Sequence, residues 1–295
     1  MDIKKMLFVT KFEELWFDAL QSLLDLNKAA LNHVVFLHVI QRDKVAMRRG
    51  AGYQKEEEIK LREMANIRFI DWAEHLFEQG MEAGVYIVVG NFAPQVISAA
   101  KKEAADLIVI GPEKKGRLEK LYSGSDIMEI IRSTASPVLV YSNISEDRKI
   151  TESPFASPLL ATNWTDADQR SVEYLKGLSN VVKEIDIIHV ADEKSLDGSS
   201  AMGVQKTRKQ ARQKLEEICD ILEAGGINAK PHVYIGETVS EVEKAARECR
   251  STMIIAGVPA KSAWKERLLG RTSKALAENS MFPVLLVPAL QIAES

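Results

Sequence analysis

The chain has 295 residues, of which 46% are hydrophobic and 27% charged, and its formal net charge is −3 at pH 7. This length suits two domains of about 100–150 residues, and the composition is typical of a globular protein. The weak negative charge gives no overall attraction to nucleic acid or to an anionic membrane, and no apolar run approaches the roughly 20 residues that span a bilayer. We therefore expect a cytoplasmic protein with no nucleic-acid or membrane partner.

The first half of the chain alternates short apolar runs, typical of strands, with stretches of helical periodicity. In the helix expected at 13–31, apolar residues recur at helical spacing at Leu15, Ala19, Leu23 and Leu26. In the long helix expected at 54–80, the predicted core-facing stripe is Ile59, Met64, Ile67, Ile70, Ala73 and Phe77. The strands are expected at 6–10, 33–40, 85–89, 106–110 and 137–141, and the other helices at 94–105 and 123–135.

The second half of the chain repeats this order. Gly111 and Gly257 are 146 residues apart, and so are Gly124 and Gly270. Self-similarity at the length of a domain predicts two tandem domains, which we place at 1–143 and 157–291 with a polar linker at 144–156. Apolar strands alternating with helices imply a parallel sheet covered on both faces. The predicted fold class is therefore α/β, with two five-stranded parallel-sheet α/β sandwich domains related by a pseudo-twofold axis.

The loop after the fourth strand of the first half has features that suit a phosphate. Ligands of open parallel sheets bind beyond the carboxyl ends of the strands, where the strand order reverses. Here Gly111 precedes a basic loop containing Lys114, and Gly124 and Ser125 then begin a helix. Glycine lets the backbone approach an anion, and helix N-terminal amides and a serine hydroxyl can donate to it. The same glycines could equally be ordinary turn and cap residues.

Several segments together resemble the universal stress protein family in a tandem, two-domain form. They are LHVI or IHVA at the second strand, DLIVIG at 106–111, the downstream Gly-Ser and the final SPVLV segment. The resemblance covers residues 3–141 and 157–288. It implies a Rossmann-like sandwich of the adenine nucleotide alpha hydrolase type, which in this family often binds ATP or AMP.

The nucleotide pattern of that family is an Asp after the first strand, a Val after the histidine of the second strand, and Gly-x-x-Gly, nine residues and Gly-Ser/Thr after the fourth. The positions that match it are Val39, Gly111, Gly124 and Ser125 in the first half and Val190, Gly257 and Gly270 in the second. Lys11 and Asn163 replace the Asp, Lys114 and Ala260 replace the second glycine, and Arg271 replaces the Ser/Thr, with Thr272 one position later. The resemblance also makes Thr10 a candidate cofactor-binding residue.

Neither half carries the complete pattern, so we expect at most one domain to bind ATP or AMP, and weakly. An equally open alternative is that neither loop binds a nucleotide and that the chain is an interaction or regulatory protein with degenerate sites. No Walker lysine, nucleophile elbow or HExxH pair is visible, so we do not expect an enzyme. His38 and His189 are interpreted as packing or hydrogen-bonding residues, and Cys219 and Cys249 as small buried residues, with no metal site.

The final strand of each half bears on assembly. Residues 137–141 and 283–287 are apolar, and each would lie at a sheet edge, where unpaired backbone groups recruit another strand. Universal stress proteins resemble one another in pairing across this strand. We therefore expect the two domains to pair with each other as an internal pseudo-dimer, and a homodimer of the whole chain stays open.

Overall fold

The computed structural model describes residues 2–10, 16–45, 53–111, 124–141, 153–192, 201–259 and 271–289. The first domain contains β1 (Lys5–Val9), α1 (Trp16–Leu23), the 3-10 helix η1 (Leu24–Ala29), β2 (His33–Gln41), α2 (Arg42–Val45), α3 (Lys55–Glu78), β3 (Glu82–Gly90), α4 (Phe92–Glu103), β4 (Leu107–Ile110), α5 (Gly124–Ser133) and β5 (Val138–Val140). The second contains β6 (Pro158–Ala161), α6 (Asp166–Lys176), β7 (Glu184–Asp192), α8 (Ala201–Ala224), β8 (Asn228–Gly236), α9 (Thr238–Glu248), β9 (Met253–Val258), α10 (Arg271–Asn279) and β10 (Val284–Pro288).

All ten strands form one sheet in the order β3-β2-β1-β4-β5-β10-β9-β6-β7-β8. Pairing is parallel within each domain, so the predicted α/β fold with two five-stranded parallel sheets is confirmed. The strand order reverses between β1 and β4 and again between β6 and β9. These two places are where a parallel sheet of this kind binds ligands.

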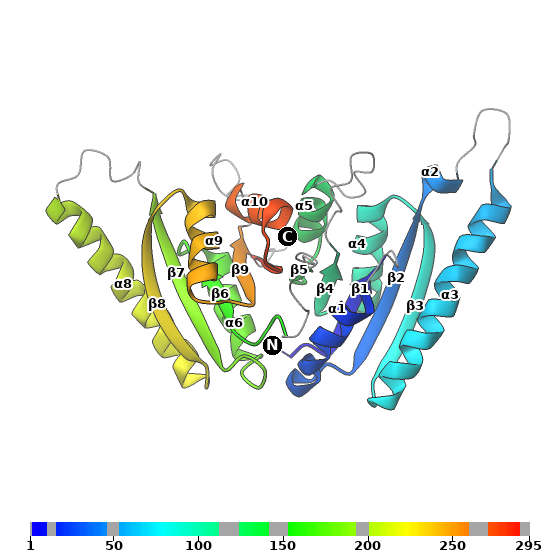
Figure 1. The fold of residues 1–295 in the computed structure, drawn as a ribbon, viewed down its shortest axis with the longest axis horizontal. Helices are drawn as coiled ribbons and strands as arrows, with labels where there is room; N and C mark the ends of the chain where they lie inside the picture. Colours follow the sequence, from blue (N-terminus) through cyan, green and yellow to red (C-terminus); the bar gives the residue numbers. More distant parts are fainter. Residues whose placement is uncertain are drawn as a thin grey trace, which may run out of the picture.

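The two domains meet through an antiparallel pair of final strands. Val284 pairs with Val140, Leu285 with Leu139 and Leu286 with Val138. In Figure 1 this junction lies at the centre, with α5 and α10 beside each other and α3 and α8 on the outer flanks of a V-shaped molecule. Arg170 of α6 also ties the domains, since its guanidinium donates to the carbonyl oxygens of Ala135 and Pro288.

The core is continuous across the junction. Alternate residues of β1 enter two different buried clusters: Met6 and Phe8 belong to one, and Leu7 and Val9 to the other. This alternation arises because side chains of successive strand residues point to opposite faces of the sheet. Each of the two clusters contains residues of both domains. The two faces of the ten-stranded sheet are therefore each covered by one core that spans the whole chain.

The first helix is shorter than predicted. It ends at Leu23, and η1 continues the chain to Ala29, where Ala30 has a left-handed φ of 80° and closes the turn. Ala19, Leu23 and Leu26 are buried as expected, while Leu15 lies outside the described residues. A short helix, α2, directly follows β2 and is not among the helices that we expected.

The predicted core-facing stripe of the long helix α3 is wrong. Ile67, Ile70 and Phe77 are 70%, 60% and 64% exposed, and Ile59 and Met64 are exposed as well. The buried face is instead Ala65, Phe69, Trp72 and Leu76. Phe69 and Trp72 pack with Phe36 of β2, with ring centroids 5.1 and 5.5 Å from it. The helix thus has a second apolar stripe that faces away from the sheet.

Part of the predicted linker belongs to the core. Phe155 is fully buried in the same cluster as Tyr141 of the first domain and Leu160 of the second. The adjoining backbone is held by Thr252, whose hydroxyl donates to the carbonyl oxygen of Pro154 and accepts from the amide of Ser157. In the part of the chain that the structure describes, no helix is long and apolar enough to cross a membrane.

Candidate functional site

Three of the predicted site residues of the first domain lie together at the carboxyl ends of its central strands. Thr10 follows β1, Val39 is near the end of β2 and Gly111 directly follows β4. These strands are neighbours in the order β2-β1-β4, so the three residues flank the place where the strand order reverses. Thr10 and Val39 are buried, and Gly111 is partly exposed. Gly124 and Ser125 are the first two residues of α5, whereas Lys114 lies outside the described residues.

The histidine of the second strand has the same role in both domains. His38 Nδ1 lies 2.9 Å from the carbonyl oxygen of Thr10, and His189 Nδ1 lies 2.9 Å from that of Thr162. Burial lowers the pKa of His189, which favours the neutral ring with a proton on Nδ1. Each histidine therefore fixes the end of the first strand against the second, as the hydrogen-bonding interpretation predicts.

In the second domain, a carboxylate closes the segment after β6. Asp168 Oδ2 accepts from the amides of Asn163 (2.9 Å) and Thr165 (2.8 Å), and the Thr165 hydroxyl accepts from the Asp168 amide. This is a capping box at the start of α6. The two loop amides that could have bound an anion thus already have an anionic partner, and a nearby phosphate would be repelled.

The same carboxylate fills the space beside Gly257. A Cβ added to Gly257 would lie 2.5 Å from Asp168 Oδ1 and 2.9 Å from the Cβ of Ala167. Glycine at this position is therefore explained by the close approach of α6. The hydroxyl of Ser273 in α10 donates to the Gly257 carbonyl oxygen at 2.9 Å, so Ser273 rather than Arg271 or Thr272 reaches this strand end.

An indole covers the ends of β6 and β7. Trp164 has a left-handed φ of 62°, which bulky residues rarely adopt. The indole ring contacts the imidazole of His189, and the two ring centroids are 4.7 Å apart. Lys214 lies on α8, and its Nζ atom is 5.2 Å from the centroid of the indole. A tilted ring contact and a cation–π contact thus hold the indole beside the end of β7. A planar base could not occupy the same face of His189.

The other predicted residues of the second domain are not all brought together. Val190 is buried at the position equivalent to Val39, next to His189 in β7. Asn163 is exposed, and so is Arg271 at the start of α10, while Thr272 is partly buried. Gly270 lies outside the described residues.

The model of the universal stress protein family matches residues 2–142 and 162–288, which is most of the chain. The chain belongs to the universal stress protein family. Because the model matches twice, this is a tandem member of the family, as the sequence predicts. Its fold agrees with that of other universal stress proteins.

A universal stress protein of Archaeoglobus fulgidus DSM 4304 has a TM-score of 0.73 to this chain at 21% identity, covering 98% of this chain and 97% of that one. One from Pseudomonas aeruginosa UCBPP-PA14 has a TM-score of 0.62 at 16% identity, covering 97% and 93%. The universal stress protein MJ0577 of Methanocaldococcus jannaschii is 27% identical over 151 residues, which is 46% of this chain and 93% of that protein.

Sequence reasoning missed the residues that shape the second domain of this universal stress protein. Asp168 was detectable, because Thr165 followed three residues later by an acidic residue is a capping-box signal. Trp164 and Ser273 had no such signal, since a left-handed tryptophan and the direction of a serine in a helix depend on tertiary packing. A group of Asp186, His232 and Cys249, far apart in the sequence, was also missed.

Proposed function

We propose that this chain is a cytoplasmic, non-catalytic stress-response protein whose first domain binds an adenine nucleotide, ATP or AMP, weakly. One observation carries the proposal: in the second domain the carboxylate of Asp168 already binds the loop amides and lies beside Gly257. Thr10, Val39 and Gly111 gather at the end of the first half-sheet, and α5 begins with Gly124 and Ser125. In the second domain, Trp164 and Asp168 occupy the corresponding region.

Charge supports the same choice of domain. Asp168 brings a carboxylate to the strand ends of the second domain. The equivalent position in the first domain, 152 residues earlier in the sequence, is Trp16, which carries no charge. The first domain also supplies Lys114 in its loop, and a lysine there could neutralise a phosphate. The nucleotide would lie with its phosphates toward the N-terminus of α5, where helix amides favour an anion.

We expect Ser125→Glu to weaken ATP binding at least tenfold, because a carboxylate at the start of α5 would repel the phosphates. An acidic residue in a helix's first turn contributes about 0.3–1 kcal/mol of favourable energy, so folding should be retained. Isothermal titration with ATP and with AMP measures the affinities. Thr272→Glu, at the second residue of α10, is the matched control and should leave them unchanged. The proposal fails if the wild-type chain gives no heat at millimolar nucleotide, or if only the control loses binding.

We propose a second function of a different class, self-association of the chain through the outer stripe of α3. The stripe is Ile59, Ile67, Ile70 and Phe77. The equivalent helix α8 lies 146 residues later and also has a buried apolar face. On its outer face, however, the positions equivalent to the stripe are Gln205, Gln213, Glu216 and Glu223. The fold therefore does not require apolar residues there, and their presence on α3 favours a contact.

The spacing of the stripe fits a second copy of the same helix. In an antiparallel pair about a twofold axis, Ile67 would meet Ile70 of the second copy, and Ile59 would meet Phe77. The same arrangement brings Lys60 toward Glu74 of the second copy, which are opposite charges, but it also places Glu63 opposite Glu74, which are like charges. Glu63 and Glu74 interrupt the stripe, so we expect a weak dimer in the micromolar range.

Sedimentation over a concentration series tests this dimer. The wild-type chain should shift toward the dimer as the concentration rises, and a chain with Ile67→Gln and Ile70→Glu, which copy Gln213 and Glu216, should stay monomeric. Met202→Gln, which removes an exposed apolar residue of α8, is the control and should behave as wild type. A wild-type chain that remains monomeric at high micromolar concentration, or a double variant that still dimerises, would contradict the proposal.

A further inference from the structure

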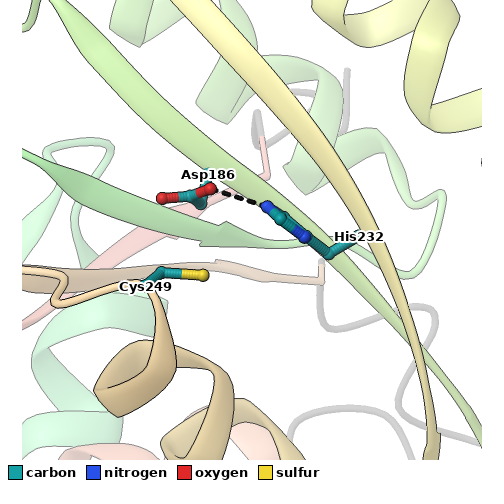
Figure 2. Close-up of side chains that lie close together, drawn as sticks. All are labelled: Asp186, His232 and Cys249. Carbon is teal, nitrogen blue, oxygen red and sulfur yellow. Dashed lines mark hydrogen bonds and ion pairs between the residues drawn. The ribbon is translucent and has the colours of Figure 1, made fainter.

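Three side chains with metal-ligand chemistry converge in the second domain, at the opposite ends of the strands from the region described above. Asp186 lies near the start of β7, His232 lies on the neighbouring strand β8, and Cys249 directly follows α9. Asp186 pairs with Lys230, so His232, two residues further along β8, is its diagonal neighbour on the same face. Figure 2 shows the carboxylate, the imidazole and the thiol directed toward one another.

The distances are close to those of a coordination sphere. His232 Nε2 is 2.7 Å from Asp186 Oδ1, and the three ligand atoms all lie within 4.8 Å of one another. Ligand atoms bound to one Zn²⁺ at about 2.0–2.3 Å in tetrahedral geometry are roughly 3.3–3.7 Å apart. Small side-chain rotations would therefore suffice. Among the described residues, no other group of His, Cys, Asp and Glu side chains meets the same criterion.

We propose that Asp186, His232 and Cys249 form a binding site for a divalent transition metal ion, with Zn²⁺ as the fitting ion. Thiolate, imidazole and carboxylate are the three ligand types that Zn²⁺ takes in proteins, and three protein ligands leave a fourth position for water. Asp186 is largely buried, while the His232 side chain is 36% exposed, which gives the ion a route from solvent. On binding, the thiol of Cys249 releases its proton to solvent as the sulfur–metal bond forms.

The group does not suit a reactive cysteine. Burial, the charge of Asp186 and a hydrogen bond to its carboxylate raise the pKa of Cys249 to about 11, so the thiol keeps its proton at neutral pH. A nucleophilic or redox-active cysteine needs the opposite effect, a lowered pKa.

The first domain shows that the fold does not require these residues. The positions equivalent to Asp186, His232 and Cys249 are Val35, Tyr86 and Glu103. There the Tyr86 hydroxyl donates to Glu103, and Lys5 Nζ lies 3.0 Å from the same carboxylate. This arrangement is a hydrogen-bonded ion pair, and the first half of the chain has no cysteine. The ligand set is therefore particular to the second domain, and the bound ion would join the end of α9 to β7 and β8.

Cobalt substitution tests the site in the untagged full-length chain after treatment with a chelator. One Co²⁺ per chain should bind, giving a thiolate-to-cobalt charge-transfer band in the near ultraviolet and the visible bands of tetrahedral Co²⁺. Zn²⁺ should abolish both, and should raise the melting temperature of the chain. Cys249→Ser keeps a hydroxyl beside Asp186 and should lose the charge-transfer band. His232→Gln should weaken binding at least tenfold.

Cys219→Ser is the matched control, because it removes the other cysteine, which is buried on α8. It should keep the band and the affinity. Circular dichroism of each variant without metal checks that the fold is retained. The proposal is overturned if the wild-type chain shows no charge-transfer band, if the band follows Cys219 instead of Cys249, or if Co²⁺ binds all four chains equally.

Discussion

Replacing Leu285 by aspartate is expected to lower the free energy of unfolding by more than about 4 kcal/mol, the largest effect that we predict. Leu285 is fully buried and pairs with Leu139 across the β5–β10 junction. A carboxylate there would lie in a cluster of buried hydrophobic residues, and burial without a partner raises a carboxyl's pKa. Below about pH 4, which is the pKa of an aspartate in an unfolded chain, the substituted carboxyl would be neutral in both the folded and the unfolded chain. Its destabilising effect should therefore grow as the pH rises above that value.

Urea denaturation at an acidic and at a neutral pH measures both parts of this prediction. Met281→Asp, at an exposed residue four positions earlier, is the control for the added charge and should change the stability by less than about 0.5 kcal/mol. A Leu285→Asp chain as stable as wild type would contradict the burial of Leu285.

Phe155→Ala should cost about 3–5 kcal/mol of unfolding free energy, although Phe155 lies in a segment whose composition is that of a linker. Its ring is fully buried in the cluster that contains Leu139, Tyr141 and Leu285, so the truncation leaves a cavity next to the junction. Because those residues come from both domains, we expect one loss of stability for the whole chain rather than for one half. Urea denaturation followed by tryptophan fluorescence measures it.

Ile221→Ala is the control, since it removes a large apolar side chain from an exposed position of α8, outside the outer stripe of α3. It should change the stability by less than about 0.5 kcal/mol. Equal effects of the two substitutions would contradict the burial of Phe155.

The strand and helix pattern was predictable because it depends on local periodicity. Short apolar runs such as 106–110 favour buried strands when helices flank them, and the 146-residue repeat gives each prediction a second, independent example. The face of α3 was not predictable in this way. That helix has two apolar stripes, and periodicity alone does not say which one meets the sheet. The aromatic residues Phe69 and Trp72 decide it, because they fill the space against Phe36.

The candidate site was predictable only in its scaffold. The glycines and the histidine of the second strand follow from backbone geometry, so Thr10, Val39 and Gly111 could be placed at strand ends from the sequence. The group of Asp186, His232 and Cys249 could not, because its members are brought together by strand register and by the end of α9, which no spacing in the sequence encodes. The same is true of Trp164, whose position depends on His189 and Lys214.

The antiparallel pairing of β5 with β10 affects which amino-acid substitutions this chain can accept. In a symmetric homodimer, every substitution occurs twice, once on each side of the axis, and both copies must tolerate it. Here one polypeptide supplies both sides, so each substitution occurs once and the two unlike halves are always present in equal number. Asp168 and Trp164 can therefore lie at the strand ends of one domain only. Likewise, Ile67 and Ile70 can form an exposed apolar surface on one domain, while the equivalent positions of the other domain have different side chains. The sheet thus behaves as an obligate heterodimer with a fixed composition.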